Sequence, residues 1–246
     1  MNWLLLRGWS REARHWGDFP AALKTAFPGS SIRTPDLPGA GERYRQRSPV
    51  RVSAMVDVVR SAERIEGKIH LFGLSLGGMA CIDWSTRFPS EVASCVLVNT
   101  SVRPFSALHE RLRLSSVPRI ARVGLAGAGM TREAGILALT SRRGSAALAE
   151  QWASYAAEKP VSTANAARQL LAAARFRAPL EAPPVPVLVL ASARDELVDP
   201  RCSEVLARRW GAKIAWHPDA GHDLPLDDPQ WVVAEVKRWL GALAGG

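Results

Sequence analysis

Short apolar runs alternate along this chain with longer segments of helical periodicity, and this alternation constrains the fold more than any other feature. A strand followed by a helix and another strand is the pattern of a parallel sheet covered by helices. Strands are predicted at residues 3–7, 31–34, 68–73, 93–99, 185–191 and 213–217. Helices are predicted at residues 15–27, 50–65, 76–88, 201–210 and 228–243. The sequence therefore predicts an α/β protein with a mostly parallel sheet.

One long segment interrupts this alternation. Residues 103–178 contain no predicted strand, only alanine-rich helical patterns. Prolines at positions 179, 183, 184 and 186 end the segment, because proline does not continue a helix. We therefore divide the chain into a first core part at residues 1–102, a helical lid inserted at 103–178, and a second core part at 179–246.

The basic charge of the chain is concentrated in this inserted segment. The formal net charge is +9, and the 11 Arg and one Lys between Arg103 and Arg177, against four Glu and no Asp, give that segment +8. A surplus confined to one segment favours an acidic partner or an anionic substrate there over general nucleic-acid binding. The alternative is that these arginines only solvate the surfaces of the helices.

Composition and cysteine spacing exclude several classes of protein. With 47% hydrophobic and 22% charged residues, the chain has the composition of an ordinary folded protein. The apolar run near its start, at residues 3–6, is too short for a signal peptide or a membrane span, so we expect a cytoplasmic protein with no membrane partner. Cys81, Cys95 and Cys202 lie far apart, which indicates small core residues rather than disulfides or a zinc site.

The stretch GLSLGG at residues 73–78 carries the first candidate for chemistry. It follows a predicted strand and precedes a predicted helix, which is where a serine is held in a strained turn with glycines two residues before and after it. Ser75 is therefore presented at the carboxyl edge of the sheet and suits a nucleophile. The alternative is that Ser75 is only the N-cap of the helix.

A serine nucleophile needs a histidine base, and His222 is the best placed of five. It follows Gly221 in the loop after the last predicted strand, at the same edge of the sheet. We expect the other four histidines to pack or to be solvated. They are His15, His70, His109 and His217.

The histidine in turn needs a carboxylate, and Asp195 lies just past the strand predicted at 185–191. Asp199 is a rival that we expect to cap helix 201–210. Asp223 adjoins the histidine in sequence but would have to fold back to reach its ring. The chain order Ser75, Asp195, His222 is that of one of the three common serine triads.

Two N–H groups are needed to stabilise an oxyanion. We assign one to the backbone of Leu76, directly after Ser75, and the other to Trp9, in the loop after the first predicted strand. The indole of Trp9 would also form a wall of the acyl pocket, although a role in the core is the alternative.

Five stretches together resemble the α/β-hydrolases along essentially the whole chain. They are LLLRGW at 4–9, DLPGAG at 36–41, GLSLGG at 73–78, SARDELVDP at 192–200 and GHDLP at 221–225. Within that superfamily the chain most resembles the carboxylesterases related to pimeloyl-acyl-carrier-protein methyl ester esterase. The resemblance implies an α/β-hydrolase fold, no cofactor, no metal, and a four-helix lid whose arginines engage an acidic acyl carrier protein.

Two departures from the family pattern stand at the start of the chain. Arg7 occupies the position before Gly8 where the wider superfamily usually has histidine. The first two strands of the family are absent, so we expect about six strands with residues 31–34 at an edge of the sheet. An exposed edge invites pairing. We hypothesise that a second subunit or the protein's own helices cover it.

These observations predict a serine carboxylesterase that works through an acyl-enzyme, with a carrier-linked dicarboxylate methyl ester as the candidate substrate. Three alternatives stay open: an acyl thioesterase, a non-hydrolytic enzyme such as a lyase or a cofactor-free oxygenase, and a binding protein on the same scaffold.

Overall fold

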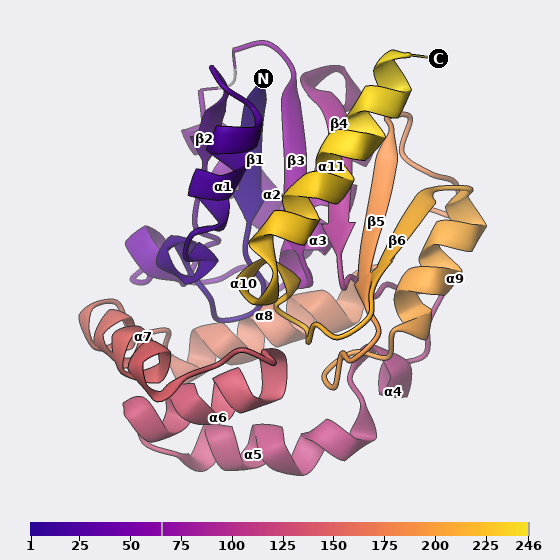
Figure 1. Ribbon diagram of the computed structural model, residues 1–246. Helices are drawn as coiled ribbons and strands as arrows, with labels where there is room; N and C mark the ends of the chain where they lie inside the picture. Colours follow the sequence, from indigo (N-terminus) through magenta and orange to yellow (C-terminus); the bar gives the residue numbers. More distant parts are fainter. Residues whose placement is uncertain (65, 246) are drawn as a thin grey trace.

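The computed structural model describes residues 1–64 and 66–245, and its centre is a six-stranded sheet (Figure 1). The strands are β1 Asn2–Leu6, β2 Ser31–Arg33, β3 Ile69–Leu74, β4 Val92–Val98, β5 Val187–Ser192 and β6 Lys213–His217. Their order across the sheet is β2-β1-β3-β4-β5-β6, and every neighbouring pair is parallel. The prediction of a mostly parallel α/β sheet is confirmed.

Helices cover both faces of this sheet (Figure 1). The core helices are α1 Phe19–Ala26, α2 Val52–Ala62, α3 Leu76–Arg87, α9 Arg201–Trp210, α10 Leu224–Asp227 and α11 Pro229–Ala244. Helices α1 and α11 pack on the face that receives Trp3 and Leu5, whereas α2, α3 and α9 pack on the face that receives Leu4 and Leu6. This alternation follows from the two-residue period of a strand. Each fully buried leucine contributes roughly 1.5–3 kcal/mol to folding.

Some predicted boundaries were wrong. The helix predicted at 15–27 is a short 3-10 turn, Ala13–Trp16, followed by α1, because Gly17 adopts a left-handed φ of 52° between them. The helix predicted at 50–65 covers only α2, and Ile65 lies outside the described residues. The strand predicted from residue 185 begins at Val187, directly after Pro186.

The inserted segment is helical and lies against the carboxyl ends of the strands (Figure 1). Its helices are α4 Leu108–Arg111, α5 Val117–Leu125, α6 Met130–Thr140, α7 Ala146–Glu158 and α8 Thr163–Arg175. The two ends of the insertion meet, since Arg103 and Arg177 form an isolated bridge and the N–H of Ala178 donates to the carbonyl of Arg103 at 2.7 Å. The lid thus leaves and rejoins the core at one point.

A few general expectations can be compared with the structure. Cys81, Cys95 and Cys202 are buried, as predicted for small core residues, and burial raises the pKa of Cys202 to about 11. None of the helices in the described part of the chain has the length and hydropathy needed to cross a bilayer. Across residues 1–64 and 66–245, no group of three or more His, Cys, Asp or Glu is arranged to hold a metal ion.

Strand β2 lies at an edge of the sheet, as predicted. It is partly covered from within the chain, because Arg33 pairs with Glu63 at 3.3 Å and donates to the carbonyl of Arg64 at 2.8 Å. Ser31 is exposed. Coverage by a second subunit stays a prediction.

Candidate active site

Ser75 stands in a strained turn between β3 and α3. Its φ of 56° and ψ of −115° lie in a region that residues with a side chain rarely occupy. Its side chain makes no capping hydrogen bond to α3, so the interpretation of Ser75 as a simple N-cap is wrong. The serine is instead turned into a cavity above the sheet.

The glycines around Ser75 are required by close backbone contacts. A Cβ on Gly73 would lie 2.5 Å from the carbonyl carbon of Gly77. A Cβ on Gly77 would overlap the carbonyl oxygen of Leu6, and one on Gly78 would overlap the hydroxyl of Thr100. The sequence analysis anticipated the first two glycines, and the tertiary structure supplies the reason for the third.

His222 and Asp195 come together in the interior of the site. Their side chains are 6% and 2% exposed, and His222 Nδ1 lies 2.7 Å from Asp195 Oδ2. The other oxygen of Asp195 accepts the N–H groups of Leu197 at 2.8 Å and Val198 at 2.9 Å. The carboxylate is therefore fixed on both sides, and it fixes the ring of His222.

The pKa of His222 is raised above its ordinary value. Burial by itself lowers this pKa, but the Asp195 carboxylate raises it more, with a further contribution from Asp223. The imidazolium form is thus stabilised inside a buried site, which is what a histidine that accepts a proton requires.

Ser75 and His222 line one cavity of about 320 Å³. Within residues 1–64 and 66–245 no hydrogen bond joins Ser75 Oγ to His222, and proton transfer requires the two to approach; such contacts are often long before substrate binds. Since Nδ1 of His222 faces Asp195, Nε2 is the nitrogen left for Ser75.

The rival acids have other partners. Asp199 accepts the N–H of Arg201, the first residue of α9, at 3.0 Å, but the N-cap residue of this helix is Pro200 and not Asp199. Asp223 turns away from the His222 ring and receives two hydrogen bonds from Arg7, at 3.0 and 2.5 Å, inside the core.

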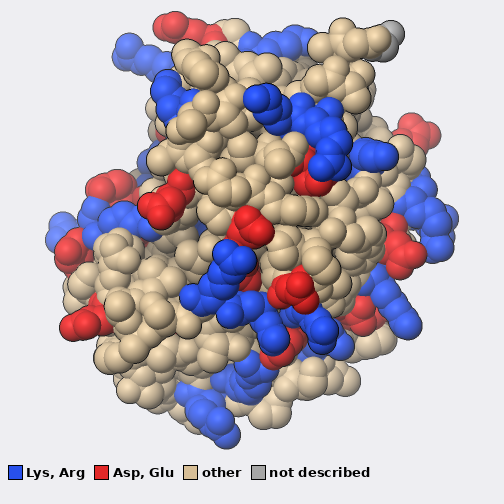
Figure 2. Space-filling view, viewed as in Figure 1, with Lys and Arg blue, Asp and Glu red and all other residues tan. Residues whose placement is uncertain are grey.

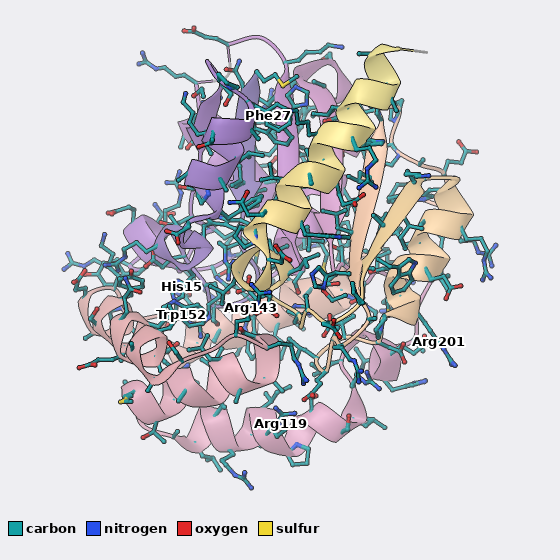
Figure 3. All side chains as sticks on the ribbon, viewed as in Figure 1. His15, Phe27, Arg119, Arg143, Trp152 and Arg201 are labelled. Carbon is teal, nitrogen blue, oxygen red and sulfur yellow. The ribbon has the colours of Figure 1, made fainter. Side chains whose placement is uncertain are left out.

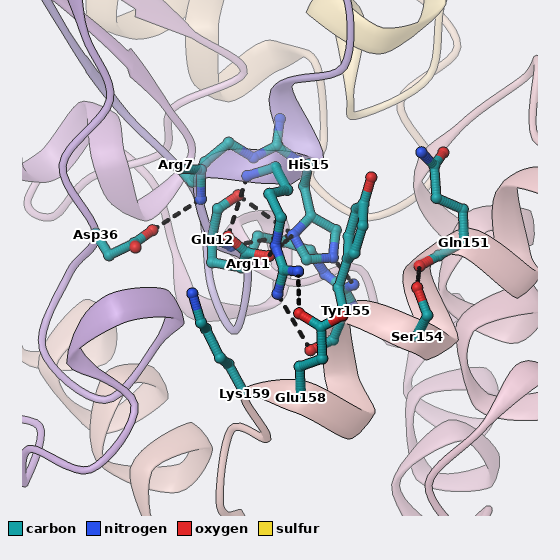
Figure 4. Close-up of polar contacts among 12 residues, drawn as sticks. Arg7, Arg11, Glu12, His15, Asp36, Gln151, Ser154, Tyr155, Glu158 and Lys159 are labelled. Carbon is teal, nitrogen blue, oxygen red and sulfur yellow. Dashed lines mark hydrogen bonds and ion pairs between the residues drawn. The ribbon is translucent and has the colours of Figure 1, made fainter.

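The other histidines are held by structural contacts or lie at the surface. His15 is buried, and its ring lies 4.7 Å from that of Trp152 (Figure 3). Figure 4 shows His15 beside Arg11 and Glu12, opposite Tyr155 and Glu158 of α7. His70 stacks on Trp3.

Two further histidines complete the set. His217 Nδ1 accepts the N–H of Ala220 at 2.8 Å and so shapes the turn that leads to His222. His109 is exposed on the lid and lines a second cavity.

Trp9 lies where the sequence analysis placed it, beside Ser75. A Cβ on the preceding Gly8 would lie 3.4 Å from Ser75 Cβ, so the backbone of this loop passes next to the serine. The indole of Trp9 lines the cavity and donates from Nε1 to the carbonyl of Ala166 in α8 at 2.8 Å. Leu76 begins α3, so its N–H has no acceptor within that helix.

A second cavity, of about 530 Å³, adjoins the first at Ser75. Ser75, Trp9, Leu170 and Leu197 line both cavities. Most of the other side chains that line the second cavity are apolar, and Leu108 and Leu114 on the lid are 66% and 70% exposed. The serine thus has space on two sides for the two parts of a substrate.

Comparison with known proteins shows the family to which this fold belongs. A family model described as "Alpha/beta hydrolase family" matches residues 3–235. The chain belongs to the α/β-hydrolase family. This confirms both the fold and the family that the sequence motifs suggested.

Relatives of this α/β-hydrolase cover different shares of it. The pimeloyl-[acyl-carrier protein] methyl ester esterase of Aromatoleum aromaticum is 30% identical over 241 residues, 92% of this chain and 93% of that protein. A homoserine O-acetyltransferase of Citrifermentans bemidjiense is 30% identical over only 97 residues, 37% of this chain and 25% of that protein.

Among solved structures, a thermophilic esterase from Thermogutta terrifontis superposes with a TM-score of 0.71 at 22% identity and covers 98% of this chain and 90% of its own. At this identity the likeness shows the fold alone.

The lid of this α/β-hydrolase is bonded to the loops that carry the candidate site. Arg113 donates to the carbonyl of Asp195 at 2.9 Å and Ser116 to that of Glu196 at 2.5 Å. Arg119 pairs with Glu196 as well. The loop that presents the acid is therefore attached to α5 and the segment before it.

The lid also holds the loop after β1. Gln169 of α8 accepts the N–H of Ser10 at 2.9 Å and donates to the carbonyl of Pro38 at 3.1 Å. Ser10 has a left-handed φ of 55°, so this turn needs support from outside the loop. The lid thus contributes to the position of the predicted oxyanion residue Trp9.

Sequence reasoning missed Asn99, at the end of β4. Its side-chain amide donates to Ser192 Oγ at 2.9 Å and to the carbonyl of His222 at 2.8 Å, while its oxygen accepts the N–H of Ser192 at 2.9 Å. It therefore links β4, β5 and the histidine loop. The polar run Asn99–Ser101 at the carboxyl edge of the sheet was the available signal.

Asp227 was missed as well. It accepts the N–H groups of Gly221 at 2.7 Å and of Arg142 at 3.0 Å, so it joins the histidine loop to the turn between α6 and α7. Nothing in the local sequence around Asp227 indicates these partners.

Proposed function

We propose that this α/β-hydrolase is a serine carboxylesterase that works through an acyl-enzyme. One observation carries the proposal: Ser75 occupies a strained turn in a cavity that it shares with His222, whose ring is bonded to the buried carboxylate of Asp195. A nucleophile, a base and a group that orients the base are the parts that acyl transfer from an ester requires.

The proposed reaction has two halves. His222 Nε2 takes the proton of Ser75 as Oγ attacks the ester carbonyl, and the N–H groups of Leu76 and Trp9 stabilise the oxyanion. His222 then gives that proton to the leaving alcohol oxygen, which leaves Ser75 acylated. Water repeats the steps, with His222 as base, and releases the acid.

The substrate we propose is a dicarboxylate methyl ester carried by an acidic acyl carrier protein. The relative from Aromatoleum aromaticum bears the name of an esterase of this kind and matches nearly the whole chain. The apolar walls of the two cavities also suit an acyl chain.

Two groups stand out among the basic side chains of the lid. Arg111, Arg113 and Arg119 donate to carbonyl oxygens within the protein, so they are partly structural. The second group is exposed and has no carboxylate partner in the described part of the chain. It consists of Arg103, Arg122, Arg143, Arg175 and Arg177.

Figure 2 shows the basic side chains over the lid with acidic ones among them. The second group supports a docking surface for an acidic carrier protein, since no carboxylate of the described residues lies within ion-pair distance of its side chains.

The test compares the wild type with Ser75→Ala on p-nitrophenyl esters of increasing chain length and on a methyl pimeloyl ester of the carrier protein. We expect the variant to keep its circular-dichroism spectrum and to lose about 10³-fold or more in kcat. Activity of Ser75→Ala within tenfold of the wild type would reject Ser75 as the nucleophile. Cleavage of acyl thioesters but no oxygen esters would favour the thioesterase alternative.

The salt dependence of hydrolysis distinguishes binding of the carrier protein from the chemical step. We expect kcat/KM for the carrier-linked ester to fall as NaCl rises from low to near-physiological concentration, because surface attraction is screened. Hydrolysis of a small neutral ester by the same preparation is the control and should not change. Equal salt dependence of both substrates would contradict docking through the lid arginines.

A further inference from the structure

Three arginines line the cavity that contains Ser75: Arg7, Arg11 and Arg132. Two of them are neutralised by buried carboxylates. Arg7 is held by both oxygens of Asp223, and Arg11 by Glu133 at 2.6 Å. Figure 4 shows Arg7 and Arg11 within the same group of side chains. Their positive charges are therefore already matched inside the protein.

Arg132 is the exception. Its Nε is buried without a hydrogen-bond partner, and in residues 1–64 and 66–245 no carboxylate lies within ion-pair distance of its guanidinium. Nε of Arg7 also lacks a partner, but the charge of Arg7 is matched by Asp223. Among the arginines that line the cavity, Arg132 alone presents an unmatched charge in the described structure.

Arg132 and Ser75 differ in which neighbouring cavity each of them also lines. Ser75 lies where the cavity meets the second, largely apolar one. Arg132, with Ser10 and Arg11, lies where it meets a third cavity of about 50 Å³ that Ser75 does not line. Arg132 and Ser75 thus line one cavity, and each also lines a different neighbouring cavity.

The lining of the cavity shared by Arg132 and Ser75 is mainly apolar. It includes Val123, Ile136, Leu139 and Trp152. A cation beside such a wall loses hydration, and an anion that binds there forms charge-assisted hydrogen bonds with the guanidinium. An acyl chain with an anionic group at its far end would pack against the apolar side chains and pair with the guanidinium of Arg132.

We infer that Arg132 binds an anionic group at the end of the substrate chain remote from the ester attacked by Ser75. The inference rests on the proposed esterase function and narrows it to esters with such a group. A free carboxylate, as in a monomethyl dicarboxylate, and the phosphate of a carrier arm offer the same chemistry to Arg132, and the experiment separates them.

The binding arm uses the Ser75→Ala protein, so it does not depend on turnover. Calorimetry measures the Kd of monomethyl adipate, monomethyl sebacate and, as the neutral control, dimethyl adipate. We expect Arg132→Gln in this background to weaken at least one monoester tenfold or more and leave dimethyl adipate unchanged. Arg132→Lys should recover part of the loss. Arg208→Gln, which removes an exposed charge on α9, should change nothing.

The turnover arm uses Arg132→Gln with Ser75 intact. We expect KM for the monoester to rise about tenfold or more and kcat for dimethyl adipate to stay constant. If only the carrier-linked ester responds, the anion is the phosphate of the arm. If the monoester responds, it is the carboxylate.

The outcomes separate this inference from the proposed function. Equal loss for charged and neutral esters in Arg132→Gln, or no loss for any anionic substrate, would overturn the anion site while Ser75-dependent hydrolysis stands. Absence of Ser75-dependent hydrolysis in the wild type would overturn the esterase. Selective monoester binding to the Ser75→Ala protein would then still support Arg132.

Discussion

The glycines around Ser75 in the core and those at the end of α5 in the lid differ in the space around them. In the core, a methyl group on Gly77 would overlap the backbone of β1, and one on Gly78 would overlap Thr100. In the lid, a methyl group on Gly124 or Gly127 would meet nothing within 4 Å. The backbone around the serine is thus determined by contacts at close range, whereas the backbone at the end of α5 has open space around it.

The lid is nevertheless not independent of the core. The N–H of Asp223 donates to the carbonyl of Thr140 in α6 at 2.7 Å, and the indole of Trp9 donates to Ala166 in α8. Together with the contacts of Arg113 and Gln169, these bonds connect the lid to the loops of the base, the acid and the predicted oxyanion residue. The core therefore sets the positions of the candidate site residues, and hydrogen bonds from the lid hold the loops that carry them.

The largest expected effect is on stability, and it compares a glycine beside Ser75 with a glycine in α5. Gly77→Ala should lower the free energy of unfolding by about 3 kcal/mol or more, because the new methyl group collides with a backbone carbonyl that has no room to move. Gly124→Ala in α5 should raise stability by up to about 1 kcal/mol, since it improves helix propensity in open space.

Urea unfolding followed by circular dichroism measures both variants. A Gly77→Ala protein as stable as Gly124→Ala would show that the elbow is not set by close packing, and the contrast between core and lid would be lost.

A smaller effect tests the support that the lid gives to the core. Gln169→Ala leaves the N–H of Ser10 and the carbonyl of Pro38 without their partner, at a cost of about 1–3 kcal/mol. The displaced loop should also lower kcat/KM for a neutral ester by about tenfold.

The matched control is Leu171→Ala, on the same helix but 40% exposed. It should change stability by less than about 0.5 kcal/mol. If Gln169→Ala and Leu171→Ala behave alike in both assays, the lid does not position the loop of Trp9.

The smallest expected effect is on the pH dependence of activity, which depends on groups of the core and not on the lid. His222 must be neutral to accept the proton of Ser75, and its pKa is raised. Activity should therefore be constant at high pH and should fall about tenfold for each pH unit below this raised pKa. Gln169→Ala should keep the same acid limb, because neither Asp195 nor Asp223 is touched.

Asp195→Asn removes the main cause of the raised pKa, so its acid limb should move toward lower pH. Profiles of kcat/KM against pH for a neutral ester check all three proteins. A limb that moves in Gln169→Ala, or stays in place in Asp195→Asn, is incompatible with this assignment.

Much of the candidate site could be predicted because its parts lie next to clear local signals. Ser75 stands between a predicted strand and helix with glycines around it, and Asp195 and His222 each follow a strand. Parallel strands bring their carboxyl ends to one edge, so three distant segments are expected to meet there. The pairing of Asp195 with His222 agrees with that rule.

The residues that hold this arrangement were harder to predict. Arg7 was noted only as a departure from the family, and Asp223 only as a rival acid, yet they pair with each other across 216 positions. Asn99 donates hydrogen bonds to Ser192 and His222, which lie 93 and 123 positions further along the chain. No periodicity or motif in one sequence encodes such contacts, because they depend on which side chains face each other after the sheet has closed.

The sequence by itself determined the order of strands and helices, the strained turn at Ser75 and the chemistry available at the carboxyl edge of the sheet. These features depend on local backbone preference and on the period of apolar residues. Only the tertiary structure decided that the lid is bonded to the loops of the candidate site, and that two cavity arginines are neutralised while Arg132 is not. Pairing of buried charges is a property of three-dimensional distance, because the attraction between two groups depends on their separation in space and not on their separation in the chain.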